Sequence, residues 1–334
     1  MDYPKVMLHL HLDGAMPKSL FVSFSKEMGY LKDMSDEEWI SSHIIKESAP
    51  LEKCLQSFDL LLKLLQTKEH LSKCSEELFE ECYNDGIRLL EVRFAPQLHT
   101  SSLTMEEATL AVCEGMHKTL NKHKDMVGGI ILCMMHGDHN DDLNTQTVLL
   151  ANKLKNEGVV GIDLAGNELA NPLSDYKAQF DLAQKLNVNI TVHAGESAPA
   201  SNVYYIASLG IKRIGHGIHA SQDIAVTNYL KEHNVTLEIS PTSNLLAKGV
   251  NSLKEHPIRY FLEQGIPLNI NTDDPLLTAS YLDDEYKMLE EIHHFNKTEF
   301  IYTNLCGANA SFCKDKDIII KQLEEAYKKI KESI

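Results

Sequence analysis

The chain opens on the stretch VMLHLHLDG, residues 6–14, in which an apolar run carries two histidines and ends in Asp-Gly. Side chains alternate between the two faces of a strand, so His9 and His11 point the same way. A short strand that ends in two imidazoles on one face provides half of a metal site. The remaining donors must come from the rest of the chain.

Seven further short apolar runs follow, and helical patterns separate most of them. The eight runs cover residues 6–12, 88–94, 129–135, 159–164, 189–193, 213–216, 236–239 and 267–271. Most are continuous rather than alternating, as expected for strands that helices cover on the outer face. Eight strands alternating with helices predict an α/β fold, a single (β/α)8 barrel of TIM type over residues 1–334.

Amphipathic patterns predict helices over residues 75–85, 104–122, 145–157, 176–186 and 223–233. The second begins TMEE, which offers a threonine N-cap and first-turn acids. The connection over residues 14–87 is unusually long for a compact domain, and such connections usually form lids or inserted helices. We therefore expect a lid-bearing helical insertion there, with one helix over 51–65. A Lys/Glu-rich helix over 317–334 is expected to pack on the barrel.

Composition narrows the class of protein. Of 334 residues, 43% are hydrophobic and 24% charged, which is ordinary for a soluble enzyme with a large core. The net charge of −16 argues against nucleic acid and anionic membranes as partners. We find no signal peptide and no apolar run near the roughly 20 residues of a membrane span. Seven widely spaced cysteines without a Cys-x-x-Cys pair indicate reduced thiols, so we expect a cytoplasmic protein. A monomer is expected separately, because no sequence feature sets the oligomeric state.

Four polar clusters each follow a different apolar run. They are therefore expected at the carboxyl ends of the strands, where such barrels hold their reactive groups. The clusters are DLAGNE (163–168), TVHAGE (191–196), RIGHG (213–217) and NTDDP (271–275). Together with the first strand they offer three imidazoles and a carboxylate: His9, His11, His193 and Asp273. This set suits zinc with a water completing the shell, although several divalent ions tolerate it.

The groups left over suit the handling of protons and substrate. A water on Zn²⁺ has its pKa lowered to about 7, which makes hydroxide available at neutral pH. His216 and Glu196 remain to handle protons, and Asp274 remains to accept a hydrogen bond from substrate. Each motif alone has a plain structural explanation, because Asp-Asp-Pro is a common turn and Glu196 sits where a first-turn acid would cap a helix. Their conjunction at four strand ends favours a metal site.

These motifs resemble those of the adenosine deaminase family within the amidohydrolase-like metal enzymes. The matching strings are HLHLDG (9–14), DLAGNE (163–168), HAGE (193–196), GHG (215–217), SPTSN (240–244) and NTDDP (271–275), in the family's order. The resemblance implies deamination of adenosine, and of 2′-deoxyadenosine, to inosine and ammonia in purine salvage. It also implies one zinc ion per chain and a purine nucleoside as the small-molecule partner.

The resemblance further implies a role for each matching residue. The zinc ligands would be His9, His11, His193 and Asp273. Glu196 would protonate or hydrogen-bond the purine N1, and His216 would orient the metal-bound water and shuttle its proton. Contacts to the substrate would come from the Asp274 carboxyl at N7, the Gly166 N–H at N3, Asp13 at the ribose 5′-hydroxyl, and Leu55 and Phe58 packed on the nucleoside.

Three alternatives remain open at this point. A relative acting on adenine or another 6-aminopurine would differ chiefly at Asp13, whose carboxylate favours a free 5′-hydroxyl and repels a 5′-phosphate. A two-metal amidohydrolase usually needs a bridging lysine after the fourth strand, where this chain has Gly166 and Asn167. A binding module without turnover is expected to lack proton-handling groups, and Glu196 and His216 are both present.

Overall fold

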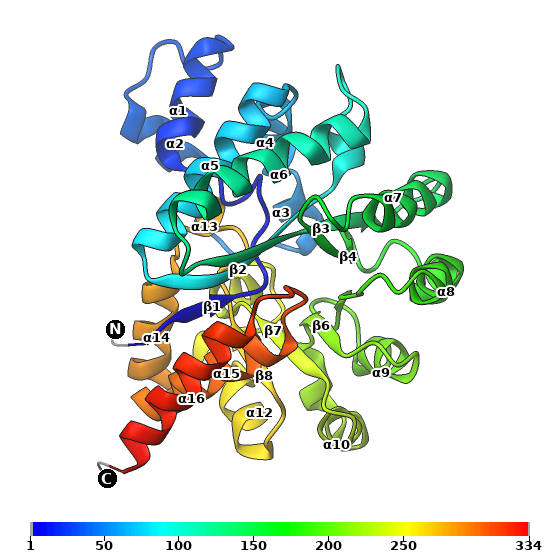
Figure 1. Cartoon of the computed structure of the whole chain (residues 1–334), viewed down its shortest axis with the longest axis vertical. Helices are drawn as coiled ribbons and strands as arrows, with labels where there is room; N and C mark the ends of the chain where they lie inside the picture. The colour runs from blue at the N-terminus through cyan, green and yellow to red at the C-terminus, as the bar shows by residue number, and fades with distance from the viewer. Residues whose placement is uncertain (1–2, 333–334) are drawn as a thin grey trace.

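The computed structural model describes residues 3–332, which form a parallel (β/α)8 barrel of TIM type, as the sequence predicts (Figure 1). The strands are β1 (Lys5–Met7), β2 (Ile87–Phe94), β3 (Val127–Met135), β4 (Val159–Ala165), β5 (His193–Ala194), β6 (Arg213–His216), β7 (Thr236–Ile239) and β8 (Leu268–Ile270). They pair in two four-stranded halves, β1-β2-β3-β4 and β5-β6-β7-β8. Parallel bridges between Ile162 and Ile190 and between Leu10 and Asp273 join the halves and close the barrel.

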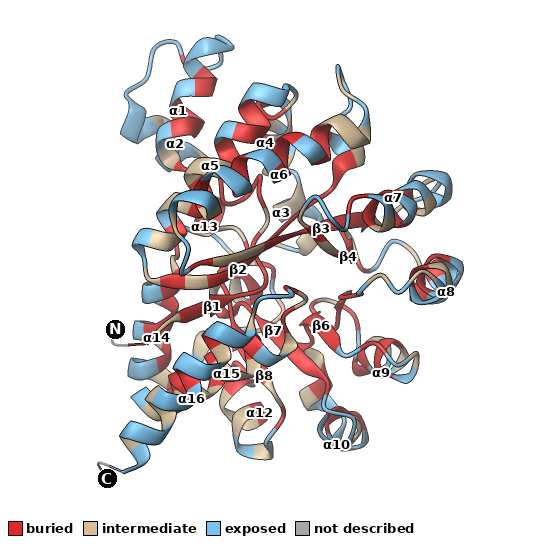
Figure 2. Cartoon of the chain, in the orientation of Figure 1, coloured by how far each residue is buried: buried red, intermediate tan, exposed pale blue. Residues whose placement is uncertain are grey.

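Helices cover the outside of the strands, and their inward faces are buried together with the strands (Figure 2). Those between β1 and β2 are α1 (Lys18–Glu27), α2 (Asp36–His43), α3 (Leu51–Leu55), α4 (Phe58–Leu64) and α5 (Lys68–Asn84). Those between β2 and β8 are α6 (Met105–Lys122), α7 (Asp141–Lys153), α8 (Lys177–Lys185), α9 (Ala200–Ser208), α10 (Ile224–Glu232), α11 (Pro241–Leu246) and α12 (Ile258–Gln264). After β8 come α13 (Pro275–Thr278), α14 (Leu282–His293), α15 (Lys297–Ala310) and α16 (Asp317–Lys331).

Local signals explain several helix boundaries. The Thr104 side chain accepts from the Glu107 N–H, which confirms the predicted N-cap of α6. The Glu107 carboxylate also accepts from the Thr104 N–H, so the cap is reciprocal. Helix α16 buries Ile319 and Leu323 along its inner side. The predicted end of this helix includes residues 333 and 334, which lie outside the described residues.

The first strand is shorter than predicted, because side chains replace its ladder partners. The N–H groups of Leu8 and His9 both donate to the Asn271 side-chain oxygen, at 2.8 and 3.0 Å. The Leu8 carbonyl accepts from the Arg93 guanidinium at 2.7 Å. Pairing resumes one residue later through bridges at Leu10 and His11, so the two histidines still lie at the carboxyl end of the barrel.

The single helix predicted over residues 51–65 is wrong, because the chain breaks at Gln56 and Ser57 into α3 and α4. Helix α4 buries Leu61 and Leu64 in the core. The break lets α3 leave the core and cross the mouth of the barrel, where Leu51 and Leu55 meet the pocket described below.

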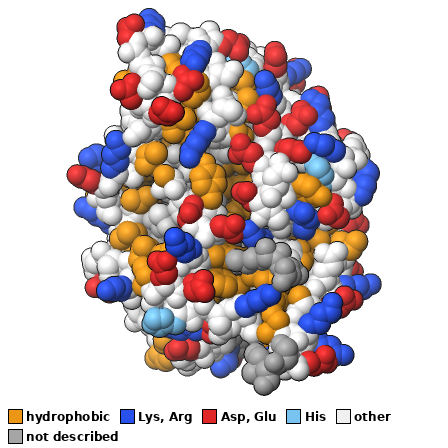
Figure 3. Space-filling model, turned by 90° about the vertical axis from the view of Figure 1, so that its left-hand side faces the viewer, with side chains coloured by type: hydrophobic (Ala, Val, Ile, Leu, Met, Phe, Trp, Pro, Cys, Tyr) orange, Lys and Arg blue, Asp and Glu red, His pale blue; other side chains and the backbone are white. Residues whose placement is uncertain are grey.

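The surface bears charges of both signs. On the face shown in Figure 3, Lys and Arg side chains lie among Asp and Glu side chains, with small apolar areas between them. Among residues 3–332, every helix is too short or too polar to cross a bilayer.

Candidate active site

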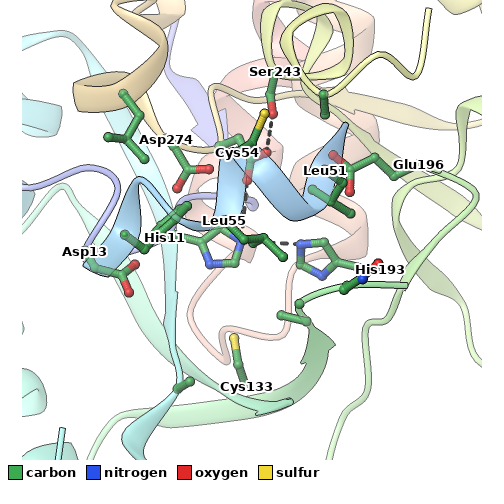
Figure 4. A pocket seen from close by; sticks show the side chains of 18 of the residues that line it. His11, Asp13, Leu51, Cys54, Leu55, Cys133, His193, Glu196, Ser243 and Asp274 are labelled. Carbon is green, nitrogen blue, oxygen red and sulfur yellow. Dashed lines mark hydrogen bonds and ion pairs between the residues drawn. The ribbon is translucent and has the colours of Figure 1, made fainter. Parts of the chain in front are cut away.

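A cavity of about 350 Å³ opens at the carboxyl ends of the strands, beneath α3 and α4. Its wall contains ten of the eleven residues singled out from the sequence: His11, Asp13, Leu55, Phe58, Gly166, His193, Glu196, His216, Asp273 and Asp274. The eleventh, His9, is fully buried just beneath it. In Figure 4 the imidazoles of His11 and His193 face each other below helix α3, while Asp13 and Glu196 lie on opposite sides. Segments far apart in the sequence therefore meet in one pocket.

Nitrogen and carboxylate donors converge on a point at the base of the cavity. Asp273 Oδ1 lies 3.1 Å from His9 Nε2 and 3.4 Å from His11 Nε2. The Nε2 atoms of His11 and His193 are 3.3 Å apart. Among the described residues, the group whose donor atoms all lie within 4.8 Å of one another is His9, His193, His216 and Asp273, so it contains His216 where the sequence predicts His11.

The outer nitrogens of two of these imidazoles face carboxylates. His9 Nδ1 lies 2.8 Å from Glu238 Oε2, and His193 Nδ1 lies 2.9 Å from Asp163 Oδ2. At His9 the Glu238 carboxylate holds the ring proton on Nδ1, which leaves the Nε2 lone pair pointing to the centre. His193 Nδ1 lies within ion-pair distance of Asp163 but makes no hydrogen bond. His9 Nε2 is buried without a hydrogen bond and faces a carboxylate oxygen, so two acceptors meet. This donor set fits a divalent cation.

A buried ionic network supports the histidines from below. The Glu238 carboxylate accepts hydrogen bonds from Arg93 Nη2 and Arg213 Nε, each at 2.6 Å. It also accepts one from the Thr191 hydroxyl at 2.8 Å. Burial alone would raise the pKa of Glu238, but Arg213 and Arg93 hold it well below its usual range. Arg93 also bonds Asp163, the partner of His193. Both histidine supports are therefore anionic and joined through one guanidinium.

Glu196 sits on a loop that another acid fixes. The backbone N–H groups of Glu196, Ser197 and Ala198 each donate to Glu168 Oε2 at 3.1 Å. The Glu196 side chain is buried and projects into the cavity. Burial, and secondly the negative charge of Asp273, raises the pKa of Glu196 to about 8. The carboxyl is thereby favoured in its protonated form near neutral pH.

Backbone strain marks two of these residues. His216 has φ +59° and Asp273 has φ +64°, in the left-handed region that non-glycine residues rarely adopt. Such conformations persist where the surroundings over-determine them, and they gather at functional sites. Next to Asp273, the Asp274 carboxyl packs so closely on Gly14 that a Cβ there would overlap its Oδ1 atom. Glycine is therefore required after Asp13 for Asp274 to lie in the wall.

Sequence reasoning missed several polar residues of the site. The Ser243 hydroxyl donates to Asp273 Oδ2 at 2.7 Å, and the Asn244 amide bonds His216. Their segment is one of the strings that resemble the family, but the sequence assigned neither residue a role. His136 lines the cavity just after β3, with both ring nitrogens buried and without a hydrogen bond. Burial lowers the pKa of His136 to about 4, so the ring is neutral. Its place at a strand end was the available signal.

Comparison with known proteins gives a consistent picture. A sequence model of the adenosine deaminase family matches residues 4–326. An adenosine deaminase of Haemophilus ducreyi is 33% identical, over 98% of this chain and 97% of the relative. The solved structure of an adenine deaminase from Arthrobacter aurescens has TM-score 0.86 and 25% identity, covering 98% of this chain and 99% of its own. An amidohydrolase from Burkholderia ambifaria with bound zinc has TM-score 0.85 and 20% identity, covering 99% and 92%.

Proposed function

The chain belongs to the adenosine deaminase family, and we propose that it converts adenosine and 2′-deoxyadenosine, with water, to the 6-oxo nucleosides and ammonia. The observation that carries this proposal is the pairing of two features in one cavity. A donor set that could hold a cation lies at the base, and beside it lies the buried carboxyl of Glu196, whose pKa burial raises to about 8. Such an arrangement suits attack of an oxygen nucleophile on an electron-poor ring carbon.

We propose zinc as the ion, held by His9, His11, His193 and Asp273. Three imidazole nitrogens and one carboxylate suit Zn²⁺, and the carboxylates behind His9 and His193 raise the basicity of their donor nitrogens. Bound there, the ion would lower the pKa of a water to about 7 and so make a nucleophile available at neutral pH.

The chain's own residues would guide the proton and the purine. Attack at C6 pushes electron density onto N1, so N1 must gain the proton that Glu196 carries. The hydroxyl proton of the newly attached oxygen would then pass to the 6-amino group, the C6–N6 bond would break, and ammonia would leave a 6-oxo ring that keeps the proton on N1. The other proton of the water would restore the acid form of Glu196. Proton transfer from a positioned acid typically contributes roughly 10²-fold to 10⁴-fold to rate. His216, 3.8 Å from Glu196 Oε2, lies where it can hold the attacking oxygen.

The walls would orient the nucleoside. Purine N7 has a lone pair, so the Asp274 carboxyl must carry a proton to bond it, in contrast to the acceptor role expected from sequence. Burial and the nearby negative charges of Asp273 and Asp13 raise the pKa of Asp274 well above its usual range, which supports that protonation. We assign the Gly166 N–H to N3, the Asp13 carboxyl to the 5′-hydroxyl, and Leu55 and Phe58 on α3 and α4 to apolar contact, as a lid.

A second candidate is deamination of free adenine, because the adenine deaminase from Arthrobacter aurescens shares the fold at 25% identity. The feature that favours the nucleoside is Asp13, a buried acid in the wall whose role needs a ribose hydroxyl.

All seven cysteines are free, as is usual in a reducing compartment. We accordingly propose that the protein acts in the cytoplasm in purine metabolism, and we propose separately that it is a monomer.

The test is a substrate panel followed by the ultraviolet change between amino and oxo purines. Zinc-loaded enzyme is expected to act on adenosine and 2′-deoxyadenosine far faster than on adenine or AMP. A chelated sample is expected to lose activity and to regain it on zinc addition. Preference for adenine or AMP would move the chain to the alternative substrate, and equal rates with and without chelator would refute the metal site.

A further inference from the structure

A chain of buried hydrogen bonds runs from the start of helix α12 to His216. The Ile258 N–H donates to His256 Nδ1 at 3.2 Å, and His256 Nε2 lies 3.1 Å from Asn244 Oδ1. The Asn244 amide nitrogen lies 2.9 Å from His216 Nδ1. All four residues are buried, so water does not compete for these bonds. The Ile258 N–H is one of the first-turn donors that a helix leaves without an internal partner.

The direction of every bond in this chain follows from its first member. A backbone N–H can only donate, so His256 Nδ1 must accept and the single proton of the neutral ring lies on Nε2. That proton goes to Asn244 Oδ1, which turns the amide NH₂ toward His216 Nδ1. Burial, and secondly the neighbouring His293, lowers the pKa of His256 to about 3, so the ring stays neutral.

We propose that α12 fixes the tautomer of His216 through His256 and Asn244, so that His216 Nε2 presents a proton, not a lone pair, to the reacting centre. With Nδ1 accepting from Asn244, the neutral ring has its only proton on Nε2. That atom lies 3.8 Å from Glu196 Oε2 and 3.9 Å from Asp273 Oδ2, beside the donor set. Asn244 and His256 are thus positioning residues.

The tautomer decides between the two donor sets described above. A nitrogen that carries a proton has no lone pair to offer a cation, so His216 drops out of the group and His11 takes the remaining place. The proton on Nε2 also makes His216 a hydrogen-bond donor to the attacking oxygen. This catalytic consequence rests on the proposed deamination, whereas the tautomer itself depends only on the protein.

The direct test is nitrogen NMR of the zinc-loaded enzyme with ¹⁵N-labelled histidine, with His216→Asn used to assign the ring signals. We expect His216 Nε2 protonated and Nδ1 unprotonated. The reverse pattern would overturn the proposal. Because this measurement needs no turnover, it stands even if adenosine proves not to be the substrate.

Substitutions give an independent test. Asn244→Asp keeps the shape but supplies a carboxylate that accepts from both rings, which moves the His216 proton to Nδ1. We expect kcat to fall roughly 10²-fold to 10³-fold, the loss typical of one removed donor, with KM little changed. His256→Gln keeps a donor toward Asn244 and is expected to retain most of kcat. His256→Leu removes that donor, so kcat is expected to fall. Wild-type kcat in Asn244→Asp would refute the assignment.

Metal content separates the two donor sets. After dialysis, His11→Ala is expected to hold less zinc than the wild type, while His216→Ala is expected to hold a full complement. Loss of zinc from His216→Ala, with retention by His11→Ala, would make His216 the ligand and contradict the fixed tautomer. Folding of each variant is checked by its thermal transition, so that metal loss is not mistaken for unfolding.

Discussion

The base of the cavity and its roof are built by opposite means. The base is polar and buried. It consists of His9, His193 and Asp273 near strand ends, and of their supports Glu238 and Asp163 within β7 and β4. The roof, formed by Leu51, Leu55 and Phe58 of α3 and α4, is apolar and only partly buried. Its helices are five and seven residues long.

This difference separates chemistry from admission of substrate. Donors at the base must hold their geometry closely, and a network in which each charge has partners supplies that rigidity. Apolar contacts at the roof have no strict direction, so short helices suffice. Helix α3 has no fully buried residue and can therefore open at low cost, whereas α4 is anchored by Leu61 and Leu64. Substitutions at the base are therefore expected to affect kcat, metal content or stability, and those at the roof KM.

The largest effect is expected for Glu196→Gln, which keeps the shape of the base but removes the transferable proton. We expect kcat to fall roughly 10²-fold to 10⁴-fold, the contribution typical of general acid catalysis, with zinc content unchanged. Steady-state kinetics and metal analysis measure the two quantities. A near-normal kcat would show that the proton reaches N1 from another group.

The next effect concerns the support beneath His9. Glu238→Gln removes the carboxylate that Arg93 and Arg213 share, although Asp163 still pairs with Arg93 and Glu91 with Arg213. Since one buried ionic partner is lost, stability is expected to fall by up to about 3–5 kcal/mol. Loss of the carboxylate behind His9 is expected to weaken zinc binding roughly 10-fold to 100-fold. Chemical denaturation and metal titration test these outcomes. The matched control is Asp181→Asn, because Asp181 pairs with Lys177 on the surface and such pairs contribute roughly 0–1 kcal/mol.

The sequence predicts the base better than its supports, for a physical reason. Polar clusters that follow apolar runs mark strand ends, and a parallel barrel brings all such ends to one face. Glu238 and Arg93 lie inside apolar runs, so their burial is suggested, but nothing local shows that they meet. The His256 relay depends on the segment just before α12 lying beside α11, where His256 meets Asn244, and sequence order does not reveal this contact. The break at Gln56 carries no glycine or proline to signal it.

Asp13 lies between the two regions, because it follows the first strand yet lies in the wall away from Glu196 (Figure 4). Asp13→Ala is expected to cost roughly 1–3 kcal/mol of transition-state stabilisation with adenosine, which lowers kcat/KM about 5-fold to 150-fold, with little change for 5′-deoxyadenosine. Asp13→Asn retains a hydrogen-bonding side chain and serves as the control. If the ratio between the two substrates does not change, Asp13 does not contact the 5′-hydroxyl.

The smallest effect is expected at the roof, where two residues of one helix allow a matched comparison. Phe58 lines the cavity, whereas Leu61 points into the core and is fully buried. Phe58→Ala removes apolar contact worth about 25 cal/mol per Å², so KM is expected to rise by roughly tenfold or less while kcat stays nearly constant. Leu61→Ala is expected to cost about 2–5 kcal/mol of stability with KM unchanged. Because the residues are three positions apart, a large fall in kcat for Phe58→Ala with normal stability would mean that the roof takes part in the chemical step.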